Sequence, residues 1–120
     1  MEPKGYVLFI VLSNAKNLKT VLKCLKSFNI TGATVMDSVG SANLYSMDDI
    51  YIPMIASSMK NLDYSSTHGK TVFSVIKDED TVLKVMDKIE HALNIDIKNL
   101  GKGIMFTVPI YSMKGLIEHQ

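Results

Sequence analysis

Residues 32–70 read GATVMDSVGSANLYSMDDIYIPMIASSMKNLDYSSTHGK and interrupt a chain that is otherwise regular. The segment begins as a strand from Ala33 to Ser38, turns at Gly40, and shows no strong pattern until order resumes at Thr71. Such a long connection without a pattern of its own is uncommon in a small domain and is usually functional or disordered. We therefore expect the flanking pieces to form a rigid platform and this segment to do the recognising.

The composition is that of a soluble domain. The chain has 120 residues, 47% of them hydrophobic and 21% charged, so we expect one domain over residues 1–120. Thirteen basic and twelve acidic side chains nearly cancel, which gives no global field to attract nucleic acid or an anionic membrane. Cys24 is the only cysteine, so a reducing, cytoplasmic location is expected. The apolar run from Tyr6 to Leu12 is too short for direct membrane insertion.

Two elements are expected before residue 32. The run from Tyr6 to Leu12 is continuously apolar, which is typical of a strand in the middle of a sheet. Ser13 or Asn14 can then cap an amphipathic helix. Its inner face is predicted to carry Leu18, Val21, Leu22, Leu25 and Phe28. Its opposite face carries a stripe of lysines, Lys16, Lys19, Lys23 and Lys26, which is either solvated or meets an acidic partner.

In the second strand we expect Ala33, Val35 and Ser38 to face one way and Thr34 and Met36 the other. After the long segment, Thr71–Ile76 is a third strand, and Asp78–Asp80 supplies acidic residues that suit the start of a helix. The inner face of that helix is predicted to be Val82, Val85, Met86, Ile89, Ala92 and Leu93. The last strand, Ile104–Ile110, contains Pro109, so we expect that end to be either an edge of the sheet or the terminus of the strand.

The predicted order is strand, helix, strand, strand, helix, strand. This is the α+β, ferredoxin-like βαββαβ sandwich, with a four-stranded antiparallel sheet, two helices on one face, and a long loop between strands two and three. Strands this apolar leave hydrophobic side chains on the uncovered face of the sheet. We expect another copy of the chain to cover that face.

Catalytic and metal sites are not expected. His68, His91 and His119 lie far apart, without a ligand or carboxylate at metal or triad spacing, and His68 with Asp63 is the least implausible metal pair. No base is near Cys24 in the sequence, so a buried thiol is favoured over a nucleophile. An enzyme would also need an acid–base pair, which the sequence does not offer. We therefore expect no enzymatic activity.

Two glycine turns are candidates for anion binding. Gly40 follows the second strand, and Gly101-Lys102-Gly103 precedes the fourth. Successive backbone amides in such turns can form a nest for phosphate, to which Lys102 would add charge, although such turns are also common for conformational reasons alone. The long segment is itself apolar and rich in methionine, so it either folds back or packs between subunits, or it forms an adaptable surface that binds a partner protein or a ligand.

With these elements placed, the chain resembles the PII-like superfamily, the nitrogen regulatory protein P-II family of signal transduction proteins. Three segments carry the resemblance: residues 32–40 as the strand into the T-loop, 71–76, and 101–106 as the B-loop and its strand. The T-loop would then cover about residues 41–70, including Asn43, Tyr45, Tyr51, Tyr64 and Lys70. No motif marks one of these tyrosines for modification, and packing is the favoured role.

The resemblance implies a homotrimer with small-molecule sites in the clefts between subunits. It also implies a protein target, a transporter or an enzyme, that is contacted through the T-loop. The ligand-binding positions that correspond are Thr34, Gly40, Ser41, Gly101, Lys102, Gly103 and Phe106. An adenine nucleotide, such as AMP or ADP, or a cyclic dinucleotide would be compatible.

Several positions depart from the family pattern. Ile104 stands where the B-loop has a basic residue, Lys102 occupies a usually acidic place, and Leu44 replaces the glutamine that helps to hold 2-oxoglutarate. The chain has no arginine, and Lys114 is only a nearby substitute for the C-terminal phosphate-binding arginines. These departures argue against ATP binding coupled to 2-oxoglutarate sensing, and favour a divergent member.

Two other functions stay open. One is a metal-binding trimer of the metal-tolerance type, and the other is a dimeric module that binds amino acids on the same topology. Nucleic-acid binding on the sheet is the weakest alternative, because the strands lack the aromatic and basic residues that stack on bases and hold phosphates.

Overall fold

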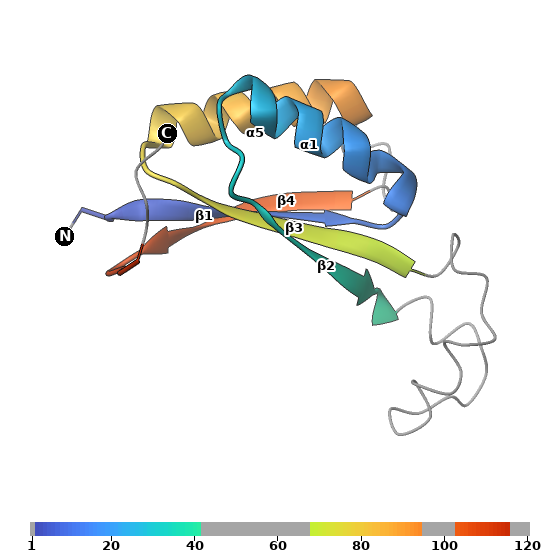
Figure 1. Ribbon diagram of the computed structural model, residues 1–120, viewed down its shortest axis with the longest axis horizontal. Coiled ribbons are helices and arrows are strands. Elements are labelled where there is room, and N and C mark those ends of the chain that lie inside the picture. The colour runs from blue at the N-terminus through green and yellow to red at the C-terminus, as the bar shows by residue number, and fades with distance from the viewer. Residues whose placement is uncertain (1, 42–67, 95–102, 116–120) are drawn as a thin grey trace.

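The structure is a computed structural model and describes residues 2–41, 68–94 and 103–115. Its elements are β1 (Gly5–Leu12), η1 (Ala15–Asn17), α1 (Leu18–Ser27), β2 (Thr34–Val39), β3 (His68–Ile76), α5 (Glu79–Leu93) and β4 (Gly103–Ile110). The strands form one antiparallel sheet in the order β2-β3-β1-β4, and α1 and α5 lie side by side on one face of it (Figure 1). The predicted ferredoxin-like sandwich is confirmed.

The most apolar strand, β1, lies in the interior of the sheet. It pairs with β3 from Tyr6 opposite Ile76 to Leu12 opposite Lys70, and with β4 along its whole length. This leaves β2 and β4 as the two edges of the sheet. Pro109 therefore lies on an edge strand, as its missing amide hydrogen predicts.

The core fills the space between the helices and the sheet. Alternate residues of β1, among them Leu8 and Ile10, are fully buried, because side chains of a strand point to opposite faces in turn. The other buried hydrophobic side chains of the described residues are Leu12, Val21, Cys24, Leu25, Ile30, Val72, Ile76, Val82, Val85, Ile89 and Leu93. Burial of this apolar surface is the main force that holds the helices on the sheet.

The inner faces of the helices differ from the prediction at Leu22 and Ala92. Leu22 is 37% exposed and Ala92 is also exposed, whereas Cys24 is 5% exposed and belongs to the core. The buried residues of α1 are Val21, Cys24 and Leu25, so these three form its inner face. Leu22 is consequently rotated to the flank of the helix.

A short 3-10 turn, η1, separates the capping residue Asn14 from the start of helix α1. Asn14 accepts a hydrogen bond from the amide of Lys16, with 2.8 Å between Oδ1 and the nitrogen, and this starts the 3-10 turn η1. Helix α1 follows directly from η1 at Leu18. Of the two predicted caps, Asn14 is the residue that supplies the side-chain bond.

Helix α5 is capped at both ends by local polar contacts. Asp78 Oδ2 accepts hydrogen bonds from the Thr81 amide at 2.9 Å and from Thr81 Oγ1 at 2.7 Å, and these bonds lower the pKa of the Asp78 carboxyl. Glu79 and Asp80 lie in the first turn, where negative charge suits the helix dipole, as predicted. Asn94 ends the helix in the left-handed conformation.

No helix in the described residues is long and apolar enough to cross a membrane.

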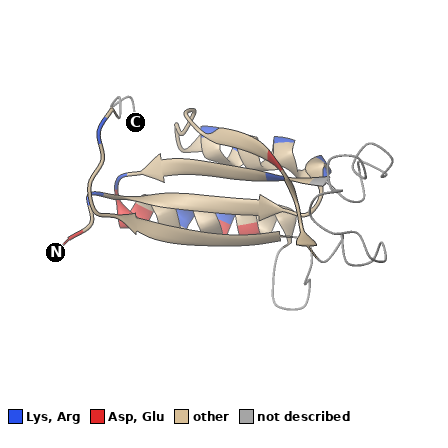
Figure 2. Ribbon diagram, turned by 90° about the horizontal axis from the view of Figure 1, so that it is seen from below, with Lys and Arg blue, Asp and Glu red and all other residues tan. Residues whose placement is uncertain are grey.

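In the described part of the chain, no helix packs on the face of the sheet away from α1 and α5, and that face carries no charged side chain. Figure 2 looks toward this face, and the only charged residues on the described strands are Asp37 and Lys70. Asp37 lies opposite Lys70, and Lys70 lies opposite Leu12, so the three side chains point to the same face of the sheet. Leu12 is buried under the helices, so both charged side chains lie on the helix face and neither lies on the other face. We call this surface the open face. It carries Val7, Phe9, Val11, Thr34, Met36, Ser38, Thr71, Phe73, Val75, Ile104, Phe106 and Val108.

Candidate functional site

All four strands contribute to one end of the sheet. Strands β1 and β2 finish there and β3 and β4 begin there, because neighbouring strands are antiparallel. The register places Asp37 opposite Lys70, Lys70 opposite Leu12, and Leu12 opposite Gly103, in a single row across the sheet. Residues 40 and 41 leave β2 at this end, so both predicted glycine turns belong to it.

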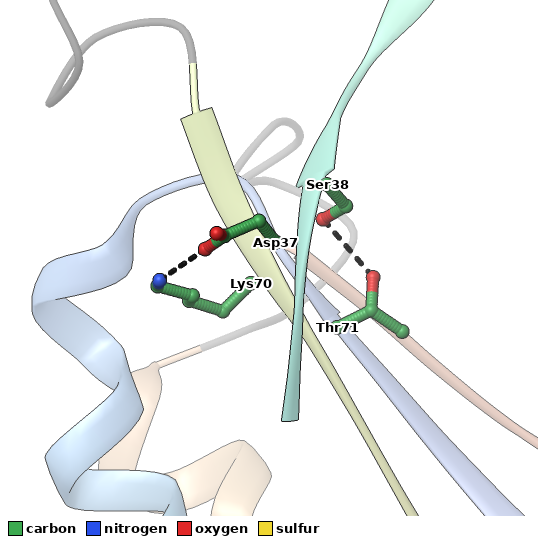
Figure 3. Close-up of polar contacts among 4 residues, drawn as sticks. All are labelled: Asp37, Ser38, Lys70 and Thr71. Carbon is green, nitrogen blue, oxygen red and sulfur yellow. Dashed lines mark hydrogen bonds and ion pairs between the residues drawn. The ribbon is translucent and has the colours of Figure 1, made fainter. Parts of the chain in front are cut away.

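Strands β2 and β3 are joined on both of their faces at this end (Figure 3). On the helix face, Lys70 Nζ forms an ion pair with Asp37 Oδ1, and the two side chains are 21% and 62% exposed. On the open face, Thr71 Oγ1 donates to Ser38 Oγ at 3.0 Å. These contacts hold the two strands together immediately beside residues 42–67. Ser38 therefore lies on the same face as Thr34 and Met36. The prediction that it faces the same way as Ala33 and Val35 was wrong.

Two glycines allow β3 and β4, the two neighbours of β1, to approach that strand closely. A Cβ atom at Gly69 would lie 1.9 Å from the Leu12 carbonyl oxygen, and one at Gly103 would lie 2.7 Å from the Val11 oxygen. Real side chains do not tolerate such contacts, so only glycine fits at either position without a shift of the backbone. The end of the sheet is therefore compact, and its geometry depends on the absence of side chains there.

The predicted ligand residues divide between the two edges of the sheet. Gly40 and Ser41 follow β2 at one edge, and Gly103 begins β4 at the other edge, with β3 and β1 between them. Gly101 and Lys102, the rest of the predicted B-loop turn, lie outside the described residues. A single copy of the chain therefore holds Gly40 and Gly103 at opposite edges of the sheet, with two strands between them.

Thr34 and Phe106 lie in one row across the open face. The register runs from Thr34 to Phe73, Phe9 and Phe106, so these four residues share that face. Phe106 is 42% exposed and stacks on Phe9, with 5.0 Å between the ring centroids, while Phe9 and Phe73 are 5.7 Å apart. Phe106 thus supports the sheet surface rather than filling the core under the helices.

The predicted T-loop positions are mostly outside the described residues. This applies to Asn43, Tyr45, Tyr51 and Tyr64. Lys70 is different, because β3 begins at His68 and so Lys70 is a strand residue paired with Asp37. The loop prediction therefore extended too far at its C-terminal end.

The metal alternative receives no support from the described residues. Asp63 and the side chain of His68 lie outside them, and no group of three His, Cys, Asp or Glu residues in the described part is close enough to hold an ion. Cys24 is buried, as the sequence predicted.

The sequence analysis did not assign the polar contacts at the end of the sheet. Asp37, Ser38 and Thr71 were read only as strand residues, although a charge in a predicted strand followed later by Lys70 was a usable signal. The aromatic row was missed for a different reason. Which of Phe9, Phe73 and Phe106 oppose one another depends on strand register, and a continuously apolar strand such as β1 does not reveal its register.

Comparison of the coordinates with solved structures supplies a relative. The structure of Arabidopsis thaliana PII bound to citrate matches with a TM-score of 0.56 and 18% sequence identity, over 89% of this chain and 78% of that chain. The chain has a PII-like fold. The predicted resemblance is confirmed at the level of the fold, and in this PII-like fold residues 42–67 connect β2 to β3. No family model matches the sequence, and no curated protein matches it.

Proposed function

We propose that the protein is a PII-like regulator, a homotrimer that binds a small anionic ligand in clefts between its subunits. Ligand binding is transmitted through the segment after β2 to a protein target, a transporter or an enzyme, without catalysis by the chain itself. The ligand can drive such a response only if it binds one arrangement of the segment more favourably than another. We further propose a cytoplasmic location.

The observation that carries this proposal is the position of the two glycine turns. Gly40 and Gly103 lie at the same end of the sheet but at opposite edges. A closed ring of identical subunits brings the β2 edge of one copy next to the β4 edge of the following copy. A cleft built in this way would have backbone amides from both turns, which is a suitable environment for an anion.

The open face supports assembly independently of the cleft. Phe106, Ile104 and Met36 on this face are each more than two-fifths exposed, and no charged side chain interrupts the surface. Exposed apolar patches of this kind usually mark an interface, and a second copy of the same face is its simplest cover. The helices would then lie on the outside of the assembly.

The class of ligand follows from the charge of the two turns. Arabidopsis thaliana PII has been crystallised with citrate, so a small polycarboxylate is one candidate to test here. Adenine nucleotides and cyclic dinucleotides are the others, because their phosphates suit the same amide nests. Ile104 and Leu44, with the lack of arginine, disfavour ATP together with 2-oxoglutarate.

The first experiment measures mass and ligand binding on the purified chain. Light scattering should give three times the mass of one copy. Citrate, 2-oxoglutarate, ATP, ADP, AMP and cyclic dinucleotides would then be compared by thermal shift, with divalent metals as a separate set. A mass of one or two copies removes the trimer. A shift with metal alone favours the metal-binding trimer instead.

A mixed-oligomer experiment tests whether each cleft needs two copies. Ser41→Glu places a negative charge at the β2 edge, and Lys102→Glu places one at the β4 edge, so each variant alone should lose affinity for the anion that the wild type binds. A mixed trimer contains clefts in which the unaltered β2 edge of one variant meets the unaltered β4 edge of the other. Partial recovery of binding in the mixture supports the shared cleft. Equal loss in the mixture and in the separate variants contradicts it.

A further inference from the structure

The lysines of α1 surround an exposed apolar groove that the proposed function does not use. Lys16, Lys19, Lys23 and Lys26 are all exposed, and with Leu22 they line a shallow groove of about 420 Å³. The floor of this groove is almost entirely hydrocarbon. We call this surface the lysine groove.

The lysine groove lies on the part of α1 that faces solvent. Lys88 of α5 donates to Ser27 Oγ at 2.7 Å, which fixes the side of α1 that faces the other helix. Successive helical residues are rotated by about 100°, so Leu22 lies about 140° around the helix axis from Ser27, Lys26 about 100° and Lys23 about 40°. Leu22 and the four lysines are all exposed, so in the described residues neither α5 nor the core covers the groove.

The positive charge of the groove is not neutralised within the described residues. None of the four lysine side chains has a hydrogen bond or ion pair there, in contrast to Lys70 and Lys84, which pair with Asp37 and Asp80. Residues 13–31 contain four lysines and no acidic residue, although the whole chain has a net charge of only +1. The remaining residues are thus net negative, and the positive charge is concentrated on α1. Figure 2 shows lysines without acidic residues on this helix, and both signs on α5.

From this arrangement we infer that the lysine groove binds an acidic amphipathic helix of a partner protein. Lys16 to Lys26 extend over about 15 Å, or roughly three turns, which matches a short helix laid along α1. Leucine or similar side chains of the partner would contact Leu18 and Leu22, and its Asp and Glu residues would meet the lysines. This is the usual recognition of a helix in a groove.

The apolar floor favours a protein partner over other polyanions. A membrane-bound helix needs a broad apolar face with aromatic residues, whereas the apolar lining of this groove is Ala15, Leu18 and Leu22, set among lysines. Single-stranded nucleic acid needs aromatic side chains for base stacking, and none lines the groove. An acidic helix with a narrow apolar stripe would pair its carboxylates with the lysines and place its apolar side chains on the floor of the groove.

The test uses a synthetic peptide of about four helical turns, with leucines on one face and glutamates beside them, and a scrambled peptide of equal composition. Binding is measured by fluorescence anisotropy, and the amide shifts of the full-length chain locate the contact. The amphipathic peptide should shift residues of α1 and bind more tightly than the scrambled one. Binding should weaken as salt is raised. Equal binding of both peptides, or shifts confined to other elements, overturns the inference.

Matched variants separate the groove from general charge and hydrophobicity. Lys23→Glu should weaken peptide binding about tenfold, and Lys84→Glu on α5 makes the same change in charge and should leave binding nearly unaltered. Leu22→Asn should likewise weaken binding, whereas Leu83→Asn removes another exposed leucine and should not. Vesicles rich in phosphatidylserine and a single-stranded RNA are tested in parallel. Preference for either over the peptide, or equal effects of the paired variants, overturns the inference. The oligomeric state does not enter this test, so it can fail or succeed independently of the proposed trimer.

Discussion

The ring of Phe106 on β4 lies over the ring of Phe9 on β1, with an interplanar angle of 13° and 5.0 Å between the centroids. Phe73 continues this row on β3, so aromatic side chains from three strands form the centre of the open face. Offset stacking of this kind adds to the stability of the sheet. It also gives the sheet a flat, apolar surface that is suited to contact with another copy.

Phe106→Asp should therefore break the assembly while leaving the subunit folded. In the proposed interface the new carboxylate would be buried without a partner, at a cost of about 3 kcal/mol or more. Light scattering should report a single copy, and circular dichroism should stay close to that of the wild type. Leu83→Asp, which replaces a 53% exposed leucine on α5, is the control and should remain assembled. Assembly of both variants would exclude the open face as the interface.

Gly69→Ala should destabilise the chain more than Gly32→Ala does. The new Cβ at residue 69 would overlap the Leu12 carbonyl oxygen, so the backbone must shift, at a cost of roughly 1–3 kcal/mol or more. Gly32 has no atom within 4 Å of the corresponding position, and alanine there should be neutral or slightly stabilising. Urea denaturation of the two variants measures the difference. Equal stabilities would show that the end of the sheet can relax without cost.

The Asp78 cap should give stability that depends on pH. Hydrogen bonds from Thr81 lower the pKa of Asp78 below its ordinary value of 3.8, so folding favours the charged carboxylate. This contribution is fully present above pH 3.8 and is lost as the pH falls through the lowered pKa of the folded state. Asp78→Asn keeps an acceptor but does not titrate. The melting temperature of the wild type should therefore fall toward that of Asp78→Asn below pH 3.8, and a constant difference would contradict the mechanism.

The ion pair between Lys70 and Asp37 should contribute little to global stability. Asp37 is 62% exposed, and exposed ion pairs contribute about 0–1 kcal/mol because water and salt screen them. A double-mutant cycle with Lys70→Met and Asp37→Asn should give a coupling free energy in this range. Reversal of both charges, Lys70→Asp with Asp37→Lys, should restore most of it. A coupling of several kcal/mol would mean that the pair is much less hydrated than its exposure indicates.

Removal of residues 46–66 with a short linker should leave the fold and the trimer intact. The core residues that the structure describes all lie in the strands and helices on either side of this segment or next to them, so we expect the platform to fold without it. The response to ligand or partner should disappear, because the proposed transmission passes through the segment. Calorimetry and light scattering check the first expectation, and partner binding with and without ligand checks the second. Unfolding of the shortened chain would contradict the division into platform and recognition segment.

Much of the fold was predictable because hydrophobic periodicity and capping residues agree with the final elements. The runs beginning at Tyr6 and Thr71 became strands, and Asp78 became the cap of α5. An error arose in α1, where residues at nearby helix positions compete for a place on the buried face. Leu22 is more hydrophobic than Cys24, yet the smaller side chain is buried, because the rotation of a helix is set by its neighbours as well as by its own hydrophobic stripe.

The candidate site was only partly predictable. The two glycine turns were recognisable as candidate anion sites, but the positions of Gly40 and Gly103 at opposite edges depend on the strand order, which long-range pairing decides. The contact between Ser38 and Thr71 joins residues far apart in the sequence, and no local pattern announces such a pair. The ion pair of Asp37 was also not predictable, because its partner Lys70 was recognisable in the sequence only as the last residue of the long segment.

The uncharged open face has a consequence for the newly made chain. In the described residues, an unassembled subunit presents apolar strands and has two edge strands, β2 and β4, and such surfaces allow unrelated chains to aggregate. The described strands place no lysine or glutamate on the open face, where either residue would discourage such contacts. If the proposed trimer forms, its assembly covers this surface, and the yield of soluble protein should then depend on how quickly newly made chains meet one another.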